Sequence, residues 1–254
     1  MSAGHVHALY RHGHTPIHGM APQVKIAISF GALVAIVSTP REAIWAFAIY
    51  GVVIAIVAAV AGVTPGYALR RLSVEVPFLI LAAMLPIFGG SPTVEILGVD
   101  LSIAGMWDAW NIVAKATLGL LIATILGATT DVTQLLSGLD GLRMPTVVTA
   151  IAGFMVRYLD VISGDWTRMR IAMASRGHDP RWFTQIGPYA RTVGVVFLRT
   201  YERGERIYLA MASRGYAGRM PEATQPATPA IQWIVGIGFV GAFWLVATTA
   251  WWLR

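Results

Sequence analysis

The chain has 254 residues, of which 56% are hydrophobic and 13% are charged, and its mean hydropathy is +0.63. A soluble domain usually carries about a quarter charged residues, so the composition excludes an ordinary soluble protein and predicts a polytopic membrane protein. Cysteine is absent, which excludes disulfides, thiolate metal sites and a cysteine nucleophile. The net charge of +6 fits arginines on a cytoplasmic membrane face, and we expect membrane lipid and no nucleic acid as a partner.

Residues 1–22 form a polar segment that holds five of the six histidines and lacks the apolar core of a cleavable signal peptide. We expect a cytoplasmic tail. Imidazole suits transition metals, but the spacing here is irregular and no carboxylate lies among the histidines. A flexible basic tail is therefore the favoured interpretation, and no metal site is predicted. The weak metal candidates are His5, His7, His12 and His14.

Five apolar runs follow, and each predicts a membrane-spanning helix: residues 24–39, 43–63, 76–90, 111–128 and 231–253. Pro86 lies inside the third run and should kink or break that helix, because proline removes a backbone hydrogen bond. Lys115 is expected in the first turn of the fourth run, where its side chain could reach the membrane interface.

The loop charges predict the orientation of these helices. Arg70 and Arg71 mark a cytoplasmic loop, whereas residues 91–110 carry acids and no Lys or Arg and should lie outside. Five spans with a cytoplasmic N-terminus satisfy every loop. Six or seven spans would require residues 144–156 or 186–200 to cross the membrane as well. The predicted division is a tail at 1–22, four spans within 23–129, a cytoplasmic helical coupling region at 130–228 and a last span within 229–254.

Residues 130–228 hold 12 arginines and 8 acids, too many for hydrocarbon, where a central charge costs about 2.5–3.5 kcal/mol. Two long helices are predicted there. One begins near Pro145 and ends at Arg176, and the other begins near Gly187 and ends at Arg214. The glycine that follows each arginine stands where a helix C-terminal cap belongs.

The hexapeptide at residues 172–177, Ala-Met-Ala-Ser-Arg-Gly, returns unchanged at residues 210–215, 38 residues later. The helix dipole stabilises an arginine in the last turn, and its guanidinium can still bind a carboxylate through two hydrogen bonds. Two ordinary glycine-capped helix ends are the alternative, but an identical pair favours one docking element that reads the same partner shape twice. The candidate docking residues are Ala174, Ser175, Arg176 and Gly177 in the first copy and Ala212, Ser213, Arg214 and Gly215 in the second.

The chain resembles the transmembrane T component of energy-coupling factor transporters, the EcfT/CbiQ family, and most closely the cobalt-type CbiQ. From His18 to Lys25 it follows the family pattern H-x-L-D-P-R-x-K, with Met, Ala and Gln in place of Leu, Asp and Arg. Residues 75–78 and 139–145 also match family patterns. The most specific match covers residues 199–203 and 206–216.

This resemblance implies that the two Ser-Arg-Gly tips dock into two ABC-type ATPase subunits, which are CbiO-like. It also implies a separate CbiM-like substrate-binding membrane subunit, with a small CbiN-like helper, in the bacterial cytoplasmic (inner) membrane. The partner ATPases would bind ATP and Mg, and this chain would be a non-catalytic permease subunit without a cofactor. The sequence agrees in one respect, because it contains no G-x-x-x-x-G-K-[ST] phosphate-binding loop.

Other functions remain open at this stage. Cobalt is the expected cargo, with nickel or a vitamin such as biotin as alternatives. A self-contained carrier would need intramembrane charges or inverted repeats, and the repeat found here lies in the predicted cytoplasmic region. A membrane enzyme could use Asp160, Glu202 and Glu205. These acids are better explained as ion-pair partners of arginines, as for Glu202 and Arg206 at i,i+4 spacing.

Overall fold

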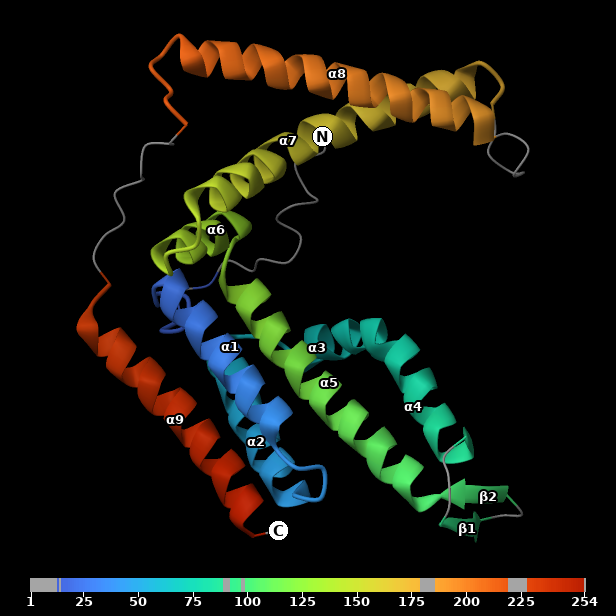
Figure 1. The fold of residues 1–254 in the computed structure, drawn as a ribbon, viewed down its shortest axis with the longest axis vertical. Coiled ribbons are helices and arrows are strands. Elements are labelled where there is room, and N and C mark those ends of the chain that lie inside the picture. Colours follow the sequence, from blue (N-terminus) through green and yellow to red (C-terminus); the bar gives the residue numbers. More distant parts are fainter. Residues whose placement is uncertain are drawn as a thin grey trace. The chain divides into compact units, whose positions relative to one another are not determined.

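The computed structural model describes residues 13, 15–88, 92–96, 99–178, 186–218 and 228–253. The described chain is almost entirely helical, as predicted, apart from one small antiparallel hairpin (Figure 1). The elements in chain order are α1 (Pro22–Ser38), α2 (Ile44–Val60), α3 (Pro65–Leu72), the 3-10 turn η1 (Ser73–Glu75), α4 (Val76–Phe88), β1 (Thr93–Ile96), β2 (Val99–Ser102), α5 (Ile103–Thr129), α6 (Val132–Gly141), α7 (Thr146–Ser175), α8 (Ile186–Ala212) and α9 (Ala230–Trp252).

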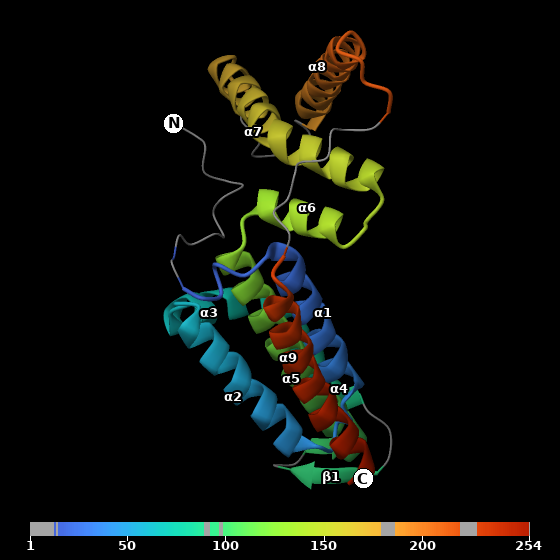
Figure 2. The ribbon, with the colours of Figure 1, turned by 90° about the vertical axis from the view of Figure 1, so that its left-hand side faces the viewer.

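The chain divides into two compact units, which we describe separately. The bundle unit comprises residues 9–138 and 226–254 and contains α1 to α5, the hairpin and α9. The arm unit lies within residues 139–225, and its main elements are α7 and α8. Within the bundle unit, α1 packs against both α9 and α5 (Figure 2). Helix α4 packs along α5.

The core of the bundle unit is apolar, and within it a tyrosine of α2 contacts a phenylalanine of α9. Tyr50 of α2 is buried, its ring stacks on Phe243 of α9 with 4.9 Å between centroids, and its hydroxyl donates to the Phe243 carbonyl at 3.0 Å. The outer faces of the helices also carry exposed large apolar side chains, such as Phe30 and Ile234. An apolar core and an apolar exterior together are what a membrane helix bundle requires.

Among the described residues, four helices are long and apolar enough to cross a membrane: the helix Pro65–Phe88, α5, α7 and α9. The predicted first two spans correspond to α1 and α2, which are apolar but have 17 residues each, or about 25 Å of helix. The chain is thus a multi-pass all-α membrane protein. Helix α7 was predicted to lie in the cytoplasm, but by length and composition it is a candidate membrane span. Its charged residues all follow Met155, so its first part is the apolar one. Its cytoplasmic location therefore stays a prediction.

The structure corrects three local expectations. The predicted loop with Arg70 and Arg71 is the helix α3, which begins at Pro65, a residue that favours the first helical position. The predicted outer loop at 91–110 contains the hairpin and the start of α5, because Ser102 caps that helix by accepting from the Gly105 amide at 3.2 Å. Helix α4 continues through Pro86 to Phe88, so this proline does not break the helix, and the expected kink stays a prediction.

The early start of α5 also overturns the prediction for Lys115. This lysine lies in the middle of α5, and its Nζ donates to the carbonyl of Val37 at 2.7 Å. Trp251 of α9 donates to the next carbonyl, Ser38, at 2.9 Å. Helix α1 cannot continue because Pro40 follows, so two of its last carbonyls obtain partners from α5 and α9 instead of from the helix itself.

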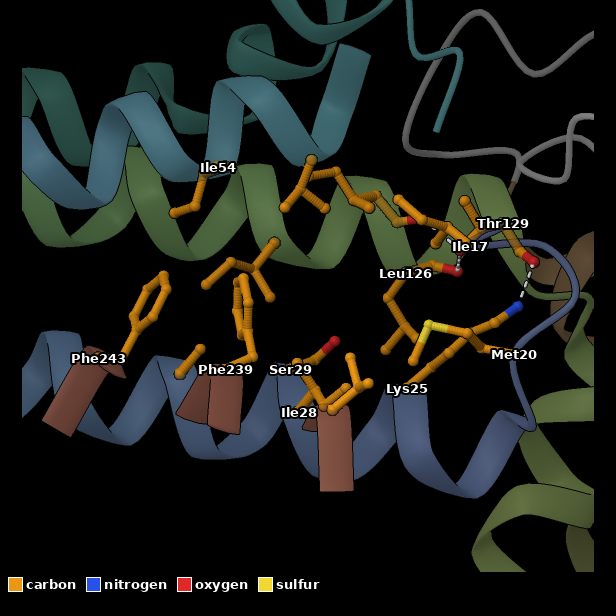
Figure 3. A pocket seen from close by; sticks show the side chains of 15 residues that line it. Ile17, Met20, Lys25, Ile28, Ser29, Ile54, Leu126, Thr129, Phe239 and Phe243 are labelled. Carbon is orange, nitrogen blue, oxygen red and sulfur yellow. Dashed lines mark hydrogen bonds between the residues drawn. The ribbon is translucent and has the colours of Figure 1, made fainter. Parts of the chain in front are cut away.

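A second lysine joins α1 to the other end of α5. Lys25 is buried, and its Nζ donates to the carbonyls of Thr129 at 3.0 Å and His18 at 3.2 Å. It lines one end of an apolar cavity of about 220 Å³ between α1, α2, α5 and α9 (Figure 3). The bond to His18 uses the backbone carbonyl of that residue, so it joins the first and last residues of the N-terminal pattern without using the imidazole.

Gly105 sets the close approach of α4 and α5. A Cβ atom at this position would press on the Leu85 carbonyl oxygen and lie 2.9 Å from the Pro86 Cα. Because backbone atoms cannot move aside easily, we expect Gly105→Ala to destabilise the bundle by roughly 1–3 kcal/mol and to lower the Tm by roughly 2–12 °C. Thermal unfolding of the detergent-solubilised protein measures this. Gly51→Ala is the matched control, since the nearest atom is 4.0 Å away, and an equal loss in both variants would contradict the prediction.

Candidate docking tips on the two arm helices

The two predicted long helices of the arm unit are confirmed. Helix α7 begins directly after Pro145 and runs to Ser175, and α8 runs from Ile186 to Ala212 with Pro188 in its first turn, where a missing amide hydrogen is tolerated. We call residues 172–178 the first tip and residues 210–216 the second tip. Each contains one copy of the repeated hexapeptide, followed by one further residue.

The first tip ends α7 with a Schellman motif. The amide of His178 donates to the Met173 carbonyl at 3.1 Å, and the amide of Gly177 donates to the Ala174 carbonyl at 3.0 Å. Gly177 has a φ of +78°, a left-handed conformation that glycine adopts without the penalty a Cβ would bring. The glycine therefore reverses the chain and satisfies the last carbonyls of the helix.

The second tip has the same hydrogen bonds. The amide of Tyr216 donates to the Met211 carbonyl at 3.0 Å, and the amide of Gly215 donates to the Ala212 carbonyl at 3.0 Å. The φ of Gly215 is +84°. The identical hexapeptide thus forms the same backbone structure twice, which confirms the predicted glycine caps.

The serines have a role that the sequence prediction missed. The hydroxyl of Ser175 donates to the Ala172 carbonyl at 3.0 Å, and that of Ser213 donates to the Ala210 carbonyl at 3.0 Å. Each serine therefore satisfies a carbonyl of the last turn through its own side chain. The signal was present in the sequence, since serine commonly bonds to a carbonyl three or four residues back.

Arg176 and Arg214 are both exposed, and within the described residues neither guanidinium has an ion-pair partner. Their planar five-donor groups are thus available to a carboxylate on another molecule. The cap alone does not distinguish the tips, because α6 ends with the same hydrogen bonds and with Arg143 at a φ of 63°. An exposed arginine immediately before the reversing glycine is what the two tips share.

The structure does not bring the two tips together. Helices α7 and α8 run antiparallel, since Asp165 pairs with Arg203 and Met173, near the end of α7, contacts Thr192, near the start of α8. The tips therefore lie at opposite ends of the crossed pair (Figure 1). The sequence predicted two similar tips but not their separation.

The histidines named as weak metal candidates and the acidic residues of α8 lie outside the two tips. His5, His7, His12 and His14 lie outside the described residues. Glu202 forms the expected ion pair with Arg206 on α8, at 4.0 Å and exposed to solvent.

The chain is similar in sequence to known transport proteins. A family model described as CbiQ, cobalt transport protein, matches residues 13–226. A putative fused cobalt transport protein CbiMQ of Methanocorpusculum labreanum is 26% identical over 230 residues, which is 85% of this chain and 37% of that protein. This chain therefore spans little more than a third of that relative.

Two further relatives match at similar identity. The energy-coupling factor transporter transmembrane protein EcfT of Staphylococcus aureus is 24% identical over 79% of each chain. The cobalt transport protein CbiQ of Rhodobacter capsulatus is 28% identical over 51% of this chain and 54% of its own. Since the family model covers most of the sequence, the chain belongs to the CbiQ cobalt transport protein family, whose members are transmembrane components of transporters.

Proposed function

We propose that this chain is the energy-coupling transmembrane subunit of an ATP-driven importer of the energy-coupling factor type, with cobalt ions as its cargo. Its two tips dock into two ABC-type ATPase subunits. The motion that accompanies ATP hydrolysis then passes through α7 and α8 to a separate substrate-binding membrane subunit. The chain itself carries out no chemical step and holds no cofactor, and it resides in the cytoplasmic membrane with its N-terminus and tips on the cytoplasmic side.

The observation that carries this proposal is the same capped, arginine-bearing helix end at two separated places. A single partner surface would need only one such end. Two identical ends at opposite ends of a crossed helix pair fit two copies of one partner, or two similar partners, that each offer a carboxylate in a narrow groove. ATPase subunits that work in pairs meet this requirement.

The cargo and the third partner are supported by the names of relatives. One relative combines CbiM and CbiQ in a single chain, and this chain matches a little over a third of it. This supports a CbiM-like membrane protein as the subunit that this chain holds. Two of the relatives reported above carry cobalt transport in their names, which favours cobalt over nickel or biotin.

The experiment that tests the proposal is uptake by a reconstituted complex. The chain is co-expressed with CbiO-like ATPases and a CbiM-like subunit with its CbiN-like helper, and uptake of radioactive cobalt is measured with excess nickel or biotin as competitor. We expect ATP-dependent cobalt uptake that is lost when either the ATPases or this chain is omitted. Uptake by the chain alone would identify a self-contained carrier and contradict the proposal, and stronger competition by nickel or biotin would reassign the cargo.

A further inference from the structure

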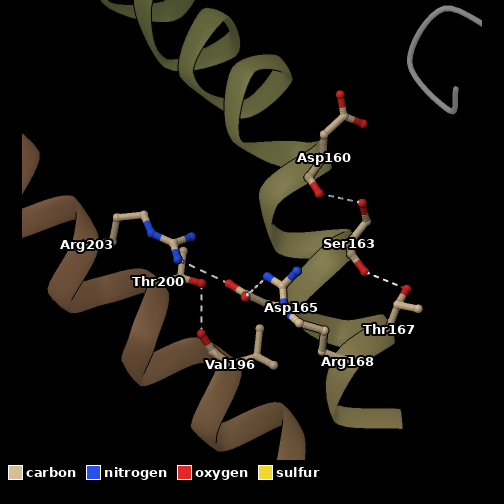
Figure 4. A network of polar contacts seen from close by, with 8 residues as sticks. All are labelled: Asp160, Ser163, Asp165, Thr167, Arg168, Val196, Thr200 and Arg203. Carbon is tan, nitrogen blue, oxygen red and sulfur yellow. Dashed lines mark hydrogen bonds and ion pairs between the residues drawn. The ribbon is translucent and has the colours of Figure 1, made fainter. Parts of the chain in front are cut away.

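The two arm helices contact each other at residues that are separated by the same offset as the two copies of the hexapeptide. The offset of 38 residues that relates Arg176 to Arg214 also relates Asp165 to Arg203. These two residues are bound to each other, with 3.2 Å between the Asp165 Oδ2 and the Arg203 Nη2 (Figure 4). Helices α7 and α8 are thus related by an approximate two-fold axis that passes near this ion pair.

This placement makes the two tips equidistant from the crossing. Arg176 follows Asp165 by 11 residues, and Arg214 follows Arg203 by 11 residues, because 176 − 165 and 214 − 203 are equal. At 1.5 Å per helical residue, each tip lies about 16 Å along its helix from the ion pair. The angle between the helices at this point therefore determines the distance between the tips.

The side-chain packing between α7 and α8 differs on the two sides of the Asp165–Arg203 contact. Trp166 of α7 packs on Tyr189 of α8, with 6.4 Å between ring centroids. The residue of α8 that follows Trp166 by the same 38 positions is Gly204, which lines a groove of about 370 Å³ together with Phe154 and Met211. The aromatic pair therefore fills one side of the crossing, whereas the other side is a groove, so side-chain packing constrains the crossing angle less on that side.

The ion pair between Asp165 and Arg203 also constrains the angle at which α7 and α8 cross. The Asp165 side chain is 12% exposed, and it also accepts from Arg168 of its own helix at 2.6 Å (Figure 4). Arg203 is 30% exposed, and its Nη1 is buried with no hydrogen-bond partner among the described residues. The guanidinium of Arg203 is therefore committed to this carboxylate, unlike an exposed ion pair that exchanges with water.

We infer that Asp165 and Arg203 are positioning residues that hold the crossing of α7 and α8 and so set the spacing of the two docking tips. The spacing role stands on the geometry of the arm unit alone. Its consequence for transport rests on the proposed function, because a fixed spacing is needed to engage two ATPase subunits at once and to transmit their motion.

Arg203→Met and Arg168→Met form a matched pair for a test. Each variant removes one guanidinium from the same carboxylate, but Arg203 crosses between the helices, whereas Arg168 lies on the same helix as Asp165 and is 71% exposed. The absence of cysteine allows spin labels at His178→Cys, the exposed last residue of the first tip, and at Ala217→Cys, the exposed residue that follows the second tip, without background labelling. Double electron–electron resonance then measures the distance between tips in the full chain in lipid nanodiscs.

We expect one narrow distance distribution in the parent and in Arg168→Met, and a distribution at least twice as wide in Arg203→Met. Arg203→Lys, which keeps the charge, should restore part of the narrowing. In the reconstituted transporter, Arg203→Met should also reduce cobalt taken up per ATP hydrolysed at least five-fold.

An equally narrow distribution in a monodisperse Arg203→Met sample would overturn the inference. Broadening without loss of uptake would leave the spacing role intact and contradict the proposed coupling function.

Discussion

Replacing both Arg176 and Arg214 by alanine should abolish ATP-driven cobalt uptake while the chain still inserts in the membrane. Both side chains are exposed and lack ion-pair partners in the described part of the chain, so their removal leaves no internal charge unpaired. In the complex, however, each would lie in a carboxylate-bearing groove, and truncating one partner of a buried charge pair costs about 2–5 kcal/mol. Each single variant should therefore bind its ATPase at least about 30-fold more weakly.

Co-purification of the ATPases and initial rates of cobalt uptake measure this effect. The matched control is Arg206→Ala, which removes an exposed arginine from α8 outside the tips and breaks only a surface ion pair with Glu202. Lysine at positions 176 and 214 should give intermediate binding, because an ammonium keeps the charge but loses the two-pronged hydrogen bonding of a guanidinium. Full uptake by the double alanine variant would exclude a docking role for these arginines.

The second large effect is expected from Gly177→Ala combined with Gly215→Ala. Both glycines have left-handed backbone conformations, with φ of +78° and +84°, and the space around each is empty. The penalty is therefore a backbone penalty of roughly 1–2 kcal/mol at each site and not a steric clash. The alanine variants should favour a frayed helix end. The neighbouring arginine would then no longer be held in the position from which it is proposed to bind the ATPase.

The expected result is a roughly 5- to 30-fold loss of ATPase binding at each changed tip, with the effects multiplying in the double variant. Gly153→Ala and Gly194→Ala are the controls, since these glycines lie inside α7 and α8 with no neighbour within 4 Å of an added Cβ. Alanine there should stabilise the helices by about 0.5–1 kcal/mol. Unchanged binding in the Gly177 and Gly215 variants would show that the reversed chain does not position the arginines.

The sequence predicted the helix ends well because they are built from neighbouring residues. Each cap depends on hydrogen bonds that span five residues or fewer, as from His178 to Met173, and on a glycine that tolerates a positive φ. The apolar runs likewise predicted the helices of the bundle unit, although their limits shifted. Ser102 starts α5 earlier than the hydrophobic pattern indicated, since a cap is a polar signal and hydropathy does not register it.

Contacts between distant residues were not predictable in the same way. Lys115 was expected near the start of a helix, and only the packing of α5 against α1 shows that it caps the Val37 carbonyl, 78 residues away in the chain. The contact of Lys25 with Thr129 spans 104 residues. Neither leaves a local pattern in the sequence, because each partner is a backbone carbonyl that every residue type carries.

By itself, then, the sequence determined that this protein is a helical membrane protein with two identical, arginine-bearing helix ends. Composition and local hydrogen bonding are enough for that. The tertiary structure decided how the two ends are arranged, because the pairing of Asp165 with Arg203 depends on the register in which α7 packs against α8. That register places in contact two residues that are 38 positions apart, the same offset that separates the two copies of the hexapeptide, and it sends the two tips in opposite directions.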